Sequence, residues 1–73
     1  MKANITEAIK EAIMNNKANI DCETNGDIYI TREGKDYVVT YFYTTGKAVV
    51  KFVTKDVEAL VSYVQGFYDA ISI

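Results

Sequence analysis

Between residues 28 and 53, three runs of β-branched and aromatic residues are separated by two glycine-bearing turns. Alternation of apolar and polar positions within such runs is typical of strands that turn one face toward a core. We therefore predict three antiparallel strands joined by two-residue hairpin loops at Glu33-Gly34 and Thr45-Gly46, where glycine accommodates a positive φ. The sequence predicts a β-meander.

These loops set a register for the meander. The first loop places Ile30 opposite Tyr37, and the second places Val39 opposite Phe52. Because successive side chains point to opposite faces of a strand, both hairpins predict the same core face. That face carries Ile28, Ile30, Tyr37, Val39, Tyr41, Tyr43, Ala48, Val50 and Phe52.

The opposite face of the predicted sheet is unusually apolar. The open face of an antiparallel sheet normally presents polar residues to water, yet valines and a phenylalanine become cross-strand neighbours here. Either a partner or one of the chain's own helices is expected to cover them. The predicted face carries Tyr29, Thr31, Asp36, Val38, Thr40, Phe42, Val49, Lys51 and Val53.

Helices are predicted on both sides of the meander. Asn4 is a candidate N-cap for a helix over residues 5–15, with a glutamate three residues further on. Thr54 is the candidate N-cap of a second amphipathic helix over residues 55–70. Gly66 inside this helix indicates either close packing or an early end.

A fourth strand is predicted over residues 18–23. A three-residue loop, Thr24-Asn25-Gly26 with Gly26 left-handed, would place Ile20 and Cys22 on the core face. A two-residue loop would instead put carboxylates there, which their desolvation opposes.

Together these elements predict one small α+β domain over residues 1–73. Its architecture is a four-stranded antiparallel β-meander flanked by an N-terminal and a C-terminal helix (α-β-β-β-β-α). The simplest packing puts both helices on one face of the sheet. The alternative, one helix on each face, would cover the second apolar face.

Composition narrows the chemistry. The 73 residues include one cysteine and no histidine, with ten acidic and eight basic residues and a net charge of −2. A histidine-assisted nucleophile and an intramolecular disulfide are excluded for the isolated chain, and a zinc site has almost no ligands. We expect a non-catalytic protein without metal or cofactor, with Cys22 buried as a small apolar residue.

The same features bear on partners and location. A mildly acidic chain with scattered lysines lacks the electrostatic footprint of a duplex-DNA binder. The N-terminal stretch carries charges and no apolar run, so neither a signal peptide nor a membrane span is predicted. The expected location is cytoplasmic.

An apolar centre with a polar rim is typical of a protein interface. We therefore predict a small interaction protein that occupies the surface of a protein partner, with a homodimer through the exposed face as one form. A compact helix-meander-helix chain of this length looks like accessory proteins of phages and mobile elements, including inhibitors such as anti-CRISPR proteins. The candidate interface residues are Tyr29, Val38, Thr40, Phe42, Val49, Lys51 and Val53.

A second function class uses the same face. Exposed aromatic rings beside a lysine can stack single-stranded bases. Tyr29, Phe42 and Lys51 would form this platform in a single-stranded nucleic-acid-binding module.

Overall fold

The computed structural model describes residues 4–22 and 25–71. Two helices flank a four-stranded antiparallel sheet whose strands follow one another in chain order. The predicted α+β fold is confirmed. The elements are α1 (Ile5–Asn15), β1 (Lys17–Asp21), β2 (Asp27–Glu33), β3 (Asp36–Phe42), β4 (Ala48–Thr54) and α2 (Val57–Ile71).

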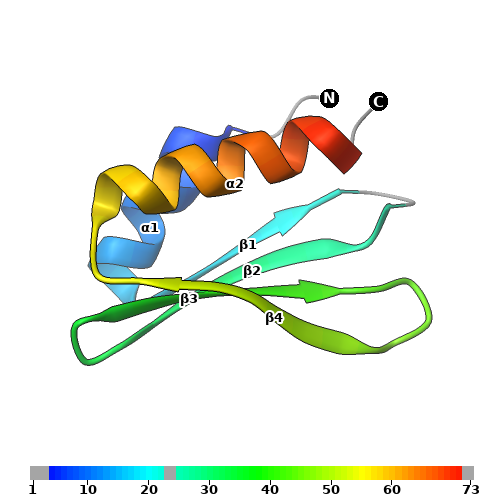
Figure 1. Cartoon of the computed structure of the whole chain (residues 1–73), viewed down its shortest axis with the longest axis horizontal. Coiled ribbons are helices and arrows are strands. Elements are labelled where there is room, and N and C mark those ends of the chain that lie inside the picture. The colour runs from blue at the N-terminus through cyan, green and yellow to red at the C-terminus, as the bar shows by residue number, and fades with distance from the viewer. Residues whose placement is uncertain (1–3, 23–24, 72–73) are drawn as a thin grey trace.

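Both helices lie on the same face of the sheet, with α1 behind α2 in the view of Figure 1. Their apolar stripes form one buried cluster with most of the predicted core face of the sheet. Ala48 and Val50 are exceptions: they were predicted on this face, but they are exposed and pair with residues of the opposite face. At its centre Ile28, Ile30, Val39, Leu60 and Val64 have no exposed surface. The two-layer packing is therefore the simpler of the two predicted arrangements, and the arrangement with one helix on each face is wrong.

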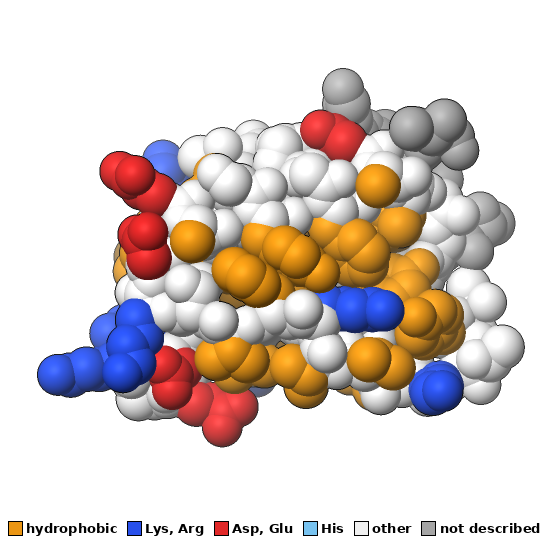
Figure 2. Space-filling model, in the orientation of Figure 1, with side chains coloured by type: hydrophobic (Ala, Val, Ile, Leu, Met, Phe, Trp, Pro, Cys, Tyr) orange, Lys and Arg blue, Asp and Glu red, His pale blue; other side chains and the backbone are white. Residues whose placement is uncertain are grey.

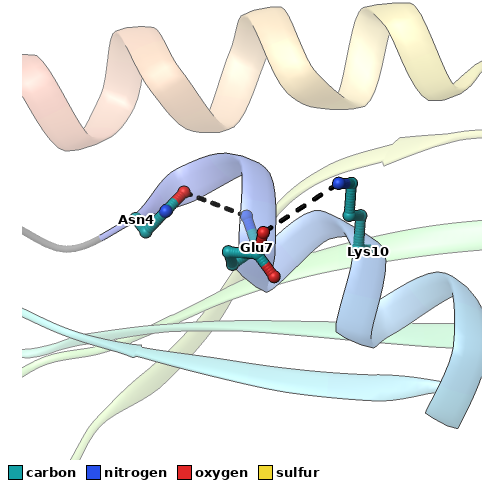
Figure 3. Close-up of polar contacts among 3 residues, drawn as sticks. All are labelled: Asn4, Glu7 and Lys10. Carbon is teal, nitrogen blue, oxygen red and sulfur yellow. Dashed lines mark hydrogen bonds and ion pairs between the residues drawn. The ribbon is translucent and has the colours of Figure 1, made fainter.

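Helix α1 begins and ends as its sequence predicts. The Asn4 side chain accepts a hydrogen bond from the Glu7 backbone N–H at 3.1 Å, and the Glu7 carboxylate lies 3.9 Å from the Lys10 ammonium (Figure 3). The first contact satisfies an amide that the helix leaves unpaired. At the other end, Asn16 adopts the left-handed conformation with φ 67°. Arg32 of β2 then donates to the Ile13 carbonyl at 3.5 Å, a cation at the negative end of the helix dipole.

Helix α2 starts two residues later than predicted, because Asp56 caps it. The Asp56 carboxylate accepts from the Glu58 N–H at 3.1 Å, while the Thr54 hydroxyl accepts from the Asp56 N–H at 3.1 Å in the preceding turn. The helix continues through Gly66, where an added Cβ would meet nothing within 4 Å. Gly66 therefore neither ends the helix nor marks a close approach.

The first hairpin turns one residue later than predicted. Its loop is Gly34-Lys35, and the register places Ile30 opposite Val39 rather than Tyr37. A hairpin loop that moves by one residue changes the pairing by two positions. Because side chains alternate with a period of two, the faces of β2 and β3 remain as predicted.

The second hairpin departs from the prediction more seriously. Tyr43 donates its N–H to the Lys47 carbonyl at 2.8 Å, which closes a three-residue loop in place of Thr45-Gly46. The pairing of β3 with β4 then shifts between Val39 and Thr40, because Lys51 is an extra residue in β4. Such a β-bulge moves the residues on its turn side to the opposite face.

The β1–β2 corner confirms the left-handed Gly26, with φ 92°. Ile20 and Cys22 are buried as predicted. The strand itself is shifted: β1 covers Lys17–Asp21 rather than residues 18–23, and Ile20 pairs with Ile28. Glu23, the last residue of the predicted strand, and Thr24 of the predicted loop lie outside the described residues.

Candidate functional site: the uncovered face of the sheet

The face of the sheet turned away from the helices is not covered by any element of the part of the chain that the structure describes. We call it the uncovered face. Its apolar side chains are more exposed toward β4: Phe42 is 37% exposed, Val53 is 53% and Val50 is 58%. The ladders place on it Tyr29, Thr31, Val38, Thr40, Phe42, Ala48, Val50 and Val53, with charged residues at the strand ends.

Two of the seven predicted interface residues do not belong to this face. The bulge pairs Val49 with Tyr41, whose side chain lies in the core, and places Lys51 outside the ladder. Tyr29, Val38, Thr40, Phe42 and Val53 lie on the uncovered face as their alternation predicts, and Ala48 and Val50 join them.

The local sequence contains a signal for this change. Strict alternation through Ala48–Thr54 puts Lys51 in one row with two valines. An extra residue at Lys51 separates the lysine from the valines and gathers Val50 and Val53 beside Val38 and Thr40. The mixed row is the feature that could have indicated a bulge.

The Lys51 side chain instead lies on the side of the sheet that carries the helices. Its Nζ donates to the Tyr43 hydroxyl at 3.2 Å and lies 5.6 Å from the centre of the Tyr43 ring. Tyr43 in turn makes an edge contact with Tyr41, with ring centres 4.7 Å apart. The predicted stacking platform therefore loses its only lysine. The two remaining rings, Tyr29 and Phe42, pack edge to face at 5.9 Å.

A row of aromatic rings fills the seam between α2 and β4 on the helix side. Phe52 stacks on Tyr63 with ring centres 4.4 Å apart, and Phe67 contacts Tyr41 at 5.1 Å. Figure 2 shows hydrophobic side chains in a band along this side of the molecule. They are partly buried and pack against the core, so the seam is the rim of the core.

Carboxylates occupy the ends of β2 on the uncovered face. Asp27 lies directly opposite Asp21, and Glu33 lies directly opposite Asp36. Like charges in directly opposed positions destabilise a sheet. Among the described strand residues, Lys17 is the one basic residue that the ladders place on this face.

An open groove borders one of these ends. It has a volume of about 490 Å³, and its lining includes Asn19, Asp21, Asp27, Phe42 and Thr44. Its lining within residues 4–22 and 25–71 contains no basic residue. The groove is a shallow extension of the uncovered face and combines an aromatic ring with two carboxylates.

The one thiol lies on the other side of the sheet. Cys22 is buried, and its Sγ lies 3.6 Å from the Ile20 carbonyl. Burial raises the pKa of the Cys22 thiol, Asp27 and Asp21 raise it further, and a backbone hydrogen bond from Ile28 opposes them. The thiol is therefore protonated at neutral pH, which does not favour nucleophilic chemistry.

Comparison of the chain with protein-family models, with curated proteins and with solved structures gives no match. Within residues 4–22 and 25–71, no group of three or more cysteine, aspartate or glutamate side chains could hold a metal ion. Neither described helix has the length and apolar character needed to cross a membrane. Inferences about function therefore rest on the geometry of the sheet and its two faces.

Proposed function

We propose that this protein is a small non-catalytic interaction module that binds a protein partner through the uncovered face of its sheet. The observation that supports this proposal is that both helices pack on one face and leave Val50 and Val53 more than half exposed on the other. An apolar patch with a charged border is the usual composition of a recognition surface.

The proposed mode of action is occupancy. A module without catalytic groups acts by filling a surface that its partner needs for another contact. The compact helix-meander-helix fold looks like accessory and inhibitory proteins of phages and mobile elements, and we extend the proposal to that role. A homodimer through the same face is a second form of the proposal.

A charge placed in the patch tests the proposal. Val50→Asp is expected to abolish partner binding because the carboxylate would have to be desolvated in the interface. Val57→Asp is the matched control, since Val57 is 38% exposed at the start of α2, in the helix layer. Wild type and the two variants are used to capture partners from a lysate of the source cell, and their masses are measured by light scattering over a range of concentrations.

The proposal is supported by a complex or dimer that Val57→Asp retains and Val50→Asp loses while its circular dichroism stays native. It fails if Val50→Asp and wild type bind the same proteins and have the same mass at every concentration.

A further inference from the structure

The charges at the ends of β2 indicate what kind of partner the uncovered face fits. Four carboxylates, those of Asp21, Asp27, Glu33 and Asp36, have ladder positions on this face, against the single ammonium of Lys17. They form two directly opposed pairs, one at each end of β2. The apolar residues of β3 and β4 lie beside and between these pairs.

A strand rises about 3.3 Å per residue, so the two acidic pairs, at Asp27 and Glu33, lie roughly 20 Å apart along β2. Each pair places two carboxylates in directly opposed positions of neighbouring strands. A cation on a partner surface would be attracted to both carboxylates of a pair. The face is therefore complementary to an apolar surface that carries a basic group at both ends.

We propose that the partner on the uncovered face is a different protein, which presents apolar side chains between lysine or arginine residues about 20 Å apart. This inference rests on the proposed function and specifies its partner. A second copy of the chain is the disfavoured occupant. Counting the ladder residues of the described strands, two uncovered faces brought together would oppose four carboxylates with four others, with one lysine from each copy.

The rest of the charge distribution agrees with this choice. Arg32 is directed to the end of α1 and Lys51 to Tyr43, so neither cation lies on the uncovered face. The groove beside Asp27 and Phe42 adds space for an aliphatic stem that ends in a cation. Both features suit a partner that brings its own basic groups.

Two disulfide-closed β-hairpin peptides provide the test. One strand of the first peptide carries two valines between two lysines spaced six residues apart on one face, and the second peptide has glutamates in place of the lysines. Binding is measured in low salt through the amide chemical shifts of β3 and β4. We expect the lysine hairpin to shift these signals and to bind about fivefold more tightly than the glutamate hairpin, since exposed charge pairs each contribute little.

Matched double variants separate local charge from net charge. Asp27→Asn with Asp36→Asn removes one carboxylate from each pair and should bring the two affinities close together. Glu11→Gln with Glu58→Gln makes the same change of net charge on exposed positions of the helices and should leave the preference intact. If the helix variant loses the preference equally, the effect is one of net charge and the inference is wrong.

Other outcomes also overturn the inference. The proposed function is tested separately, by the experiment with Val50→Asp. Equal binding of both hairpins, or binding of neither, contradicts the inference. So does a dimer of the chain that Val50→Asp dissociates, although that dimer supports the proposed function. A native partner that is lost by Val50→Asp but unaffected by Asp27→Asn with Asp36→Asn contradicts it as well, because the interface on this face would then lack charge selection.

Discussion

The two faces of the sheet carry similar side chains on the neighbouring strands β3 and β4. Val39 on the covered face has no exposed surface, whereas Val50 on the uncovered face is 58% exposed. Tyr41 and Phe42 differ in the same sense, with 8% and 37% exposed. Residue type alone therefore does not distinguish the covered face from the uncovered face. The position of a residue relative to the helices does distinguish the two faces. The free energy of folding should therefore depend mainly on residues of the covered face.

The largest expected effect tests this comparison directly. Val39→Ala should lower the free energy of unfolding by about 2 to 3 kcal/mol, because it removes buried methyl groups and leaves a cavity. Val50→Ala makes the same change on the uncovered face and should cost less than about 0.5 kcal/mol. Urea denaturation followed by circular dichroism measures both. Equal losses would mean that the uncovered face is part of the monomer's core.

A second pair of variants compares two glycines. Gly26 has φ 92°, and an added Cβ would approach the Phe42 carbonyl oxygen. Gly26→Ala should therefore destabilise the fold by about 1 to 3 kcal/mol through backbone strain. Gly66→Ala, at an open position inside α2, should instead stabilise it by up to about 1 kcal/mol. Thermal and urea unfolding should give opposite signs; a shared sign would contradict the assignment of one of these glycines.

The charged ends of the uncovered face should show a smaller effect. Asp36→Asn removes the like-charge contact with Glu33 and should raise the free energy of unfolding by a few tenths of a kcal/mol in low salt. The gain should shrink as salt screens the pair. Unfolding at two salt concentrations measures it, with Glu11→Gln as the control for net charge. A loss of stability in Asp36→Asn would show that this carboxylate stabilises the hairpin.

The smallest effect on stability at neutral pH is expected from the ionisation of two buried groups on the covered face. Burial raises the pKa of Cys22 and of Tyr41, and both groups are neutral when protonated. The unfolded chain releases these protons at lower pH than the native chain does. Stability from these groups is therefore complete below pH 9.0, the ordinary value for cysteine, and is lost as the pH rises through the raised values. Cys22→Ala should remove the cysteine share of that decline in urea titrations from pH 7 to 10, with Tyr41→Phe as the companion variant. A wild-type decline that neither variant reduces would refute this origin.

The faces of β2 and β3 could be predicted from the sequence because alternation has a period of two. The first hairpin loop was misplaced by one residue, yet the pairing moved by two positions and Ile30 remained in the core. The position of Val50 could not be predicted in the same way. It depends on a three-residue loop and a bulge at an edge strand, where a missing neighbour leaves the backbone free to insert a residue.

The helix caps show the same limit. Asn4 was identified because no competing residue precedes α1, whereas Thr54 and Asp56 both satisfy the pattern of an N-cap. Only the backbone path after β4 decides that Asp56 caps α2 and Thr54 stabilises the turn before it.

The bulge at Lys51 also opposes self-association through the β4 edge of the sheet. β4 is an outer strand, and a regular, flat outer strand rich in valine is a template on which further copies can add strand by strand. An inserted residue and a lysine at mid-strand interrupt that template. The apolar face of the sheet can thus stay exposed while its β4 edge resists edge-to-edge aggregation.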